Sequence, residues 1–163
     1  MCVLSPQRIL ELITELAIFE RAPTEVTNTA EQLLEDGWGP HPRFIAFMAH
    51  TATSPSIAVG FALCYFSYST WKGTCLYLED LYVQQSCRGS GVGLALIHRC
   101  VAEAQARGCK RVQWQALDWN APALAFYEKM GAAELREWIT LRLDAQAIEA
   151  FLAKHKPVYN SLQ

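Results

Sequence analysis

The sequence lacks the features of several large protein classes. Its 163 residues contain no C-x-x-C pair, and its six cysteines and four histidines show no spacing typical of a zinc site. The longest apolar run, Ile57 to Phe66, is much shorter than the ~20 residues that a membrane-spanning helix needs. The start of the chain lacks the charged and long apolar regions of a signal peptide. We therefore expect a protein of the reducing cytoplasm, with no metal and no membrane partner.

The sequence also lacks a large excess of either charge. Fourteen Lys and Arg residues face sixteen Asp and Glu residues, and without a concentrated basic stripe a duplex nucleic-acid partner is not expected. The charges are nevertheless unevenly distributed. Residues 1–81 carry nine acidic and four basic residues, whereas residues 82–163 carry seven acidic and ten basic ones. These are either solvated surface charges or the sign of a protein that binds a cation on one side and a polyanion on the other.

Hydrophobic residues make up 52% of the chain and charged residues 18%, which excludes an intrinsically disordered protein. A chain of this length buries roughly two thirds of the surface that its unfolded form exposes. There is no internal repeat, linker or low-complexity segment. We therefore expect one domain over residues 1–163.

Apolar periodicity and turn residues predict alternating helices and strands. A first helix begins at Pro6 with Ser5 as its N-cap and ends near Phe19. The other predicted helices cover residues 29–36, 91–107, 120–131 and 145–154, and the predicted strands cover residues 43–50, 56–68, 74–84, 111–117 and 134–143. Short turns between the first three strands indicate an antiparallel meander, and the strand-helix-strand unit over 74–117 indicates a parallel, right-handed crossover. The predicted fold class is α/β (α+β), with a mixed, mostly antiparallel sheet and helices on both faces.

The densest chemical signal is the segment Arg88-Gly89-Ser90-Gly91-Val92-Gly93, which lies between a predicted strand and a predicted helix. Glycines allow the backbone to approach a ligand, and the first amides of a helix have no internal partner, so such a turn can hold a pyrophosphate. A plain tight connection is the alternative. The segment is not a P-loop, because no Gly-Lys-Ser or Gly-Lys-Thr follows. A dinucleotide fold would need another glycine spacing, and only Asp118 after the next strand favours it.

The same segment resembles the acyl-CoA pyrophosphate signature of the GNAT acetyltransferases. The segment from Asn120 to Ala132 is similar to the second signature of that superfamily. Three further segments are similar to the spermidine/spermine N-acetyltransferases and their thialysine-acetylating relatives: 33–39, 65–71 and 76–81. The chain departs from that group in two places. The first strand of the family is reduced to a few residues, and Ser69 stands where the polyamine enzymes have an acid, so polyamine specificity stays open.

The resemblance implies an acetyl-CoA-dependent N-acetyltransferase in which the amine of a small cationic acceptor attacks directly. The acceptor would be a polyamine or a lysine-like amino acid, and the protein would be a homodimer. A protein or peptide amine is an alternative acceptor, and a non-catalytic acyl-CoA sensor or scaffold is an alternative of another class. A route through an acetylated cysteine is disfavoured, because Cys87 beside Arg88 has no obvious histidine partner.

The resemblance also implies roles for individual residues. Tyr127 matches the general acid of the family, and a phenol of pKa ~10 can protonate a thiolate whose thiol has a pKa of ~8.5. Glu79 would face the acceptor and act as base through water. Asp80 should point to the opposite face of the strand unless a bulge brings it near. The implied cofactor contacts are Leu81, Tyr82, Val83, Arg88, Gly89, Ser90, Gly91, Val92, Gly93, Leu94, Asn120, Ala123 and Tyr127. The implied acceptor contacts are Phe19, Glu20, Trp71, Glu79, Asp80 and Trp138.

Overall fold

The computed structural model describes residues 5–51 and 54–155, without the side chains of residues 54–56, and these residues gather into two compact units. One unit runs to Asn120 and the other begins at Ala121. The expectation of a single domain over the whole chain stays a prediction. Cys2 and the reduced first strand expected at the start of the chain lie outside the described residues.

The first two helices begin where the sequence predicts. Helix α1 (Pro6–Phe19) is capped by Ser5, whose side-chain oxygen accepts a hydrogen bond from the amide of Arg8. Helix α2 (Ala30–Trp38) is capped by Thr29 in the same way. The predicted end of α2 before Gly37 is wrong, because the helix continues to Trp38. Gly37 serves close packing instead, since a Cβ there would lie 2.7 Å from the ring of Phe44.

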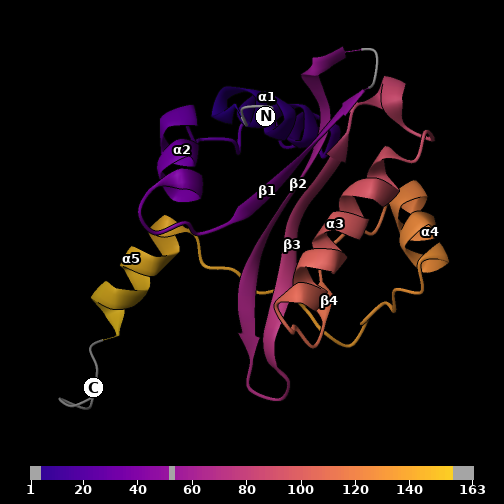
Figure 1. Cartoon of the computed structure of the whole chain (residues 1–163). Helices are drawn as coiled ribbons and strands as arrows, with labels where there is room; N and C mark the ends of the chain where they lie inside the picture. The colour runs from indigo at the N-terminus through magenta and orange to yellow at the C-terminus, as the bar shows by residue number, and fades with distance from the viewer. Residues whose placement is uncertain (1–4, 52–53, 156–163) are drawn as a thin grey trace. The chain divides into compact units, whose positions relative to one another are not determined.

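The sheet has the order β1-β2-β3-β4. Strands β1 (Ile45–Thr51), β2 (Ser54–Ser69) and β3 (Gly73–Val83) pair antiparallel, as the short turns predict, and lie side by side in Figure 1. The short 3-10 helix η1 (Gln85–Cys87) and helix α3 (Val92–Ala106) lead to β4 (Val112–Gln113), which pairs parallel with β3. The predicted meander and parallel crossover are therefore confirmed.

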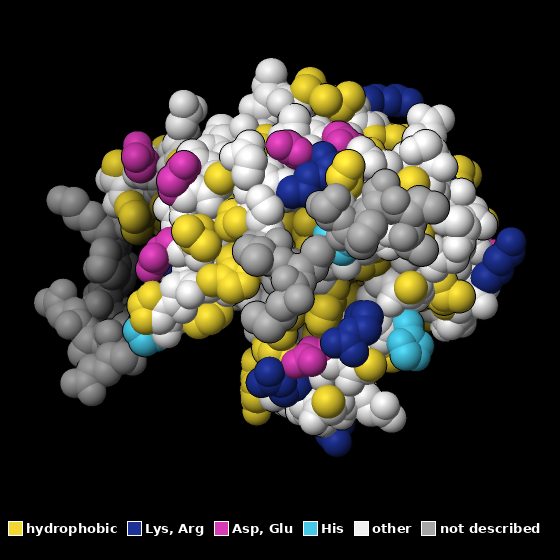
Figure 2. All heavy atoms as spheres, turned by 45° about the horizontal axis from the view of Figure 1, so that its top comes forward, with side chains coloured by type: hydrophobic (Ala, Val, Ile, Leu, Met, Phe, Trp, Pro, Cys, Tyr) yellow, Lys and Arg dark blue, Asp and Glu magenta, His cyan; other side chains and the backbone are white. Residues whose placement is uncertain are grey.

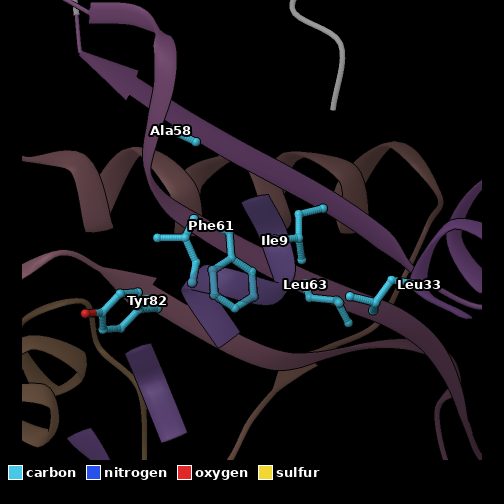
Figure 3. Close-up of a cluster of buried hydrophobic side chains, with 7 residues drawn as sticks. Ile9, Leu33, Ala58, Phe61, Leu63 and Tyr82 are labelled. Carbon is cyan, nitrogen blue, oxygen red and sulfur yellow. The ribbon is translucent and has the colours of Figure 1, made fainter. Parts of the chain in front are cut away.

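Helices pack on both faces of this sheet. On one face, Ile9 and Leu12 of α1 and Leu33 of α2 form a buried cluster with Phe61 and other side chains of β2 and β3 (Figure 3). On the opposite face, Cys100 of α3 interacts with Cys64 of β2, which follows the cluster residue Leu63 and therefore points the other way. The mixed sheet with helices on both faces, which the sequence predicts, is confirmed.

Two predicted strands differ from the structure. The strand expected over 111–117 is reduced to β4, which pairs with β3 at only two positions. The strand expected over 134–143 is absent, because no ladder among the described residues includes that segment. Its side chains alternate as in a strand, but without a neighbour its backbone groups cannot form a ladder. Leu141 is 90% exposed, and hydrophobic side chains are visible at the surface in Figure 2.

The second unit contains α4 (Ala121–Lys129) and α5 (Ala145–Lys154). Asp144 caps α5 by accepting a hydrogen bond from the amide of Ala147 at 2.8 Å, and α5 matches its prediction. Helix α4 ends two residues before the predicted end at Gly131, which has a positive φ. Among residues 5–51 and 54–155, no helix combines the length and the apolar character that a membrane span needs.

Candidate functional site

A β-bulge in β3 creates the most unusual charged cluster of the first unit. Leu63 of β2 pairs with Asp80, but the next residue, Cys64, pairs with Leu78, so Glu79 is an extra residue in β3. The register places Asp80 opposite Leu63, on the face covered by α1 and α2. The two consecutive carboxylates therefore lie together at a local distortion, which was one of the two arrangements that the sequence left open.

The surroundings of Asp80 disfavour its charged form. Burial, and after it the charges of Glu79 and Glu20, raise the pKa of the Asp80 carboxyl to about 7. Burial also raises the pKa of Glu20. At neutral pH the three acidic side chains thus share a site in which Asp80 is close to half protonated. A carboxyl with such a pKa can both accept and release a proton near neutral pH.

Two tyrosines beside this cluster were not expected as site residues. Tyr65 of β2 and Tyr77 of β3 are directly paired, and their rings stack with centroids 5.2 Å apart. Burial, and then the charge of Glu79, raise the pKa of both phenols. The two-residue spacing of Tyr77 and Glu79 could have indicated that Tyr77 lies near the acidic cluster. That Tyr65 pairs with Tyr77 depends on strand register, which the sequence does not reveal.

The end of α1 is held against the end of β3. The carboxylate of Glu15 accepts hydrogen bonds from the hydroxyl of Tyr82 at 3.1 Å and from Nε2 of Gln84 at 3.0 Å. In Figure 3 the hydroxyl oxygen of Tyr82 points away from the other labelled side chains of the cluster. These bonds position the last turn of α1, so that Glu20 lies within electrostatic reach of Asp80.

Arg88 connects the glycine-rich segment to these two elements. Its Nε donates a hydrogen bond to the carbonyl oxygen of Val83 at 2.9 Å. Its guanidinium carbon lies 4.9 Å from the ring centroid of Phe19 and 5.7 Å from that of Tyr82. The side chain of Arg88, which is expected to contact a phosphate, is therefore packed against the ends of α1 and β3.

The glycine-rich segment has the backbone of an anion-binding turn. Gly89 and Gly91 have φ values of +75° and +87°, which favour glycine, and a Cβ at either position would meet no atom within 4 Å. Gly91 is the N-cap of α3 and supplies no side-chain cap. The hydroxyl of Ser90 donates to the carbonyl oxygen of Cys87 at 2.6 Å and braces the turn. The first amides of α3 have no partner within the helix and could bind an anion, as the sequence predicts for this turn.

The expected pantetheine contacts follow the acidic bulge directly. Leu81, Tyr82 and Val83 pair with β2 along one edge. Along the other edge of β3, the described part of β4 reaches only Leu76 and Tyr77. The outward backbone groups of residues 81–83 are therefore not covered by β4, and an extended ligand with amide groups could pair with them.

Trp71 is not brought to the acidic cluster. It lies in the turn between β2 and β3 and is 78% exposed. Asp80 lies seven positions along β3 from Gly73, which follows this turn, a span of about 23 Å.

Other expected site residues belong to the second unit or its border. Tyr127 and Ala123 are half-buried in α4, and the ring of Tyr127 lies 5.5 Å from that of Phe126. Trp138 is exposed in the segment before α5, and Asn120 ends the first unit. Within the described residues there is no group of three or more His, Cys, Asp or Glu side chains that could hold a metal ion.

Comparisons with known proteins agree on one family. Residues 10–132 match the model of the acetyltransferase (GNAT) family. The thialysine N-epsilon-acetyltransferase of Bos taurus is 37% identical over 154 residues, which cover 90% of this chain and 91% of that protein. The spermidine/spermine N(1)-acetyltransferase-like protein 1 of Homo sapiens is 37% identical over 131 residues, which cover 78% of this chain but 19% of that protein.

The fold is also found in a solved aminoglycoside acetyltransferase. The structure of AAC(6')-Iy in complex with the bisubstrate analog CoA-S-monomethyl-acetylneamine has a TM-score of 0.66 and 19% sequence identity. The match covers 86% of this chain and 92% of the solved chain. At this identity the likeness concerns the fold.

Replacing Asp80 by Asn should stabilise the protein more at high pH than at low pH. The pKa of Asp80 in the folded chain, about 7, lies above its ordinary value of 3.8, so the folded state binds the proton more tightly. The wild-type chain therefore loses stability as the pH rises between these values, and loses no more above them. Thermal melting should show a larger gain in Tm for Asp80→Asn at about pH 8 than at about pH 5.

The exposed Asp118 provides the matched control. Asp118→Asn should change Tm little at either pH. A gain for Asp80→Asn that is equal at both pH values would contradict the description of the cluster.

Proposed function

Since this chain belongs to the acetyltransferase (GNAT) family and is an N-acetyltransferase, we propose that it acetylates the primary amine of a small cationic acceptor, with acetyl-CoA as co-substrate. The acceptor is a polyamine or a lysine-like amino acid. The observation that carries the proposal is the bulge that brings Glu79 and Asp80 together within electrostatic reach of Glu20. The relatives named as thialysine and spermidine/spermine acetyltransferases support an acceptor of this size and charge.

The acidic cluster would bind the acceptor and remove its proton. An alkylamine with a pKa of ~10 is almost wholly protonated at neutral pH and cannot attack a thioester in that form. Glu79 and Glu20 would hold the ammonium group. Glu79 stays a candidate base through water, and Asp80 is a second one. Because the pKa of Asp80 is about 7, it accepts a proton from the ammonium more readily than a carboxylate with an ordinary pKa.

The cofactor would lie along β3 and α3. When bound, acetyl-CoA supplies the acetyl group as a thioester. The backbone of Leu81, Tyr82 and Val83 would pair with the pantetheine arm, and Asn120 and Ala123 would contact the same cofactor. The amides from Gly89 to Leu94 would hold the pyrophosphate. The solved relative bound to a CoA bisubstrate analog supports a direct transfer between the two substrates.

Tyr127 would act as the general acid that protonates the departing thiolate. The aromatic side chains of Phe19 and Trp138 stay candidates for the wall of the acceptor site, whereas Trp71 lies too far along the sheet from Asp80.

We also propose that the enzyme is a cytoplasmic homodimer. Exposed apolar side chains between residues 135 and 143, among them Ile139 and Leu141, are compatible with a second copy covering them. Sedimentation of the purified chain would show a monomer if this proposal is wrong.

The proposed cofactor turn is tested by two glycines with the same constraint. Gly91 and Gly108 both have positive φ values and open space around the position of a Cβ, so alanine at either position carries a similar strain of roughly 1–2 kcal/mol. Only Gly91 lies at the start of α3. Titration calorimetry should show that Gly91→Ala weakens acetyl-CoA binding by about tenfold or more, the loss of one hydrogen bond to a charged group.

Gly108→Ala should leave that affinity nearly unchanged. Equal effects of the two substitutions on acetyl-CoA affinity would show that the turn has no special part in binding.

The activity itself is tested by measuring thiol release from acetyl-CoA with polyamines, diamines, lysine analogues and peptides with free N-termini. We expect turnover with a small amine. Tyr127→Phe should lower kcat by roughly 10²–10⁴-fold without weakening acetyl-CoA binding, because only the proton donor is lost. Tyr68→Phe, at an exposed position, is the control.

Turnover with peptides alone would point to a protein acceptor. Binding of acetyl-CoA without turnover of any amine would favour a sensor and contradict the proposal.

A further inference from the structure

The turn that follows α1 contains a strained arginine. Arg21 is the one residue other than glycine with a positive φ, 62°, among residues 5–51 and 54–155. Its amide donates to the carbonyl oxygen of Ile18, and the amide of Ala22 donates to that of Ala17, a helix end at which glycine is usual. Arginine in this conformation is strained relative to an ordinary backbone geometry. Strained backbone conformations of this kind cluster at functional sites, which makes Arg21 a candidate site residue.

The guanidinium of Arg21 lies at one end of a row of two aromatic rings and two cations in contact. Its guanidinium carbon lies 4.5 Å from the ring centroid of Trp119. The ring of Trp119 lies 5.8 Å from that of Phe19, which is covered by the guanidinium of Arg88. A stacked guanidinium keeps its N–H groups in the plane of the fork, where they can bind a carboxylate with two parallel hydrogen bonds.

Arg21 and Arg88 differ in the hydrogen bonds that their guanidinium groups make. Arg88 donates to the carbonyl oxygen of Val83, whereas none of the hydrogen bonds between described residues uses the guanidinium of Arg21. No ion pair between described residues includes either arginine. The Arg21 side chain is exposed, so its fork is accessible to a ligand.

The location of Arg21 relates it to the proposed acceptor site. Arg21 follows Glu20, whose charge acts on Asp80, and its stacking partner Trp119 is next to Phe19. Arg21 therefore follows a residue of the acidic cluster directly in the chain, and its guanidinium lies over Trp119, the neighbour of the expected acceptor contact Phe19. A polyamine has only positive charges and would be repelled by this cation. An amino acid with a side-chain amine has both an ammonium group for the carboxylates and a carboxylate for the cation.

We propose that Arg21 determines acceptor specificity by binding the carboxylate of a diamino acid, so that the acceptor is of the lysine type rather than a polyamine. This inference rests on the proposed function. Arg21 is a specificity-determining residue, and the reaction at the amine does not require it.

The test compares acceptors that differ only by a carboxylate: thialysine and bis(2-aminoethyl) sulfide, lysine and cadaverine. Wild-type enzyme should have a higher kcat/KM for the amino acid of each pair. Arg21→Gly, which also removes the backbone strain, should lower the ratio of the two kcat/KM values by about tenfold or more, the usual effect of one charge-assisted contact. Arg21→Gln should lower it similarly while the strain remains.

Two measurements separate this effect from a general loss of structure. The Tm of Arg21→Gly should equal or exceed that of the wild type, because glycine prefers this backbone conformation. Arg107→Gln is the matched control, since Arg107 stacks on Phe66 near the end of α3 and should leave the ratio unchanged.

Three results would overturn the inference. The first is a wild-type preference for the diamines. The second is an unchanged ratio in Arg21→Gly. The third is a weakened affinity for acetyl-CoA with the ratio unchanged, which would assign Arg21 to the phosphates of the cofactor. Binding of acetyl-CoA without turnover of any amine would instead refute the proposed function itself.

Discussion

The desolvation of the Asp80 carboxyl, within electrostatic reach of two other acidic side chains, is the constraint on which the proposed site depends. Such a group destabilises the folded chain whenever it is ionised, so its position must be imposed by the surrounding structure. The long pairing of β2 with β3 imposes it from one side, and the buried residues of α1 from the other. The bulge at Glu79 interrupts the ladder between β2 and β3 and thereby brings two consecutive carboxylates together.

One strand organises both halves of the proposed reaction. Residues 79 and 80 of β3 are in the acidic cluster, and residues 81 to 83 continue directly into the edge proposed for the cofactor arm. The side chain of Arg88 then links the glycine-rich turn to the ends of β3 and α1 through Val83 and Phe19.

Local sequence patterns predicted the elements well where they are determined by local chemistry. Ser5 and Pro6 predicted the start of α1, and the parallel crossover followed from the order of strand, helix and strand. The prediction of a strand over 134–143 was wrong, because an alternating apolar pattern does not reveal whether a neighbouring strand is present to pair with it. The role of Gly37 was missed for the same kind of reason, since only the packed ring of Phe44 explains why it lies inside a helix.

The chemistry of the site was predictable in type but not in detail. The pair of Glu79 and Asp80 pointed to an amine site, but a single sequence does not reveal which of them lies in the bulge. The stacking of Arg21 and Arg88 along Trp119 and Phe19 joins residues about 100 positions apart, and no local pattern contains it. The raised pKa of Asp80 likewise arises from tertiary burial, with Glu20 contributed by another element.

The most direct test of the central claim is the pH dependence of kcat/KM for the best amine acceptor in wild-type enzyme and in Asp80→Asn. The account predicts that the wild-type profile rises through an inflection at about pH 7, where Asp80 becomes able to accept a proton, and that the variant is slower and lacks this inflection. An unchanged inflection in Asp80→Asn would contradict the account.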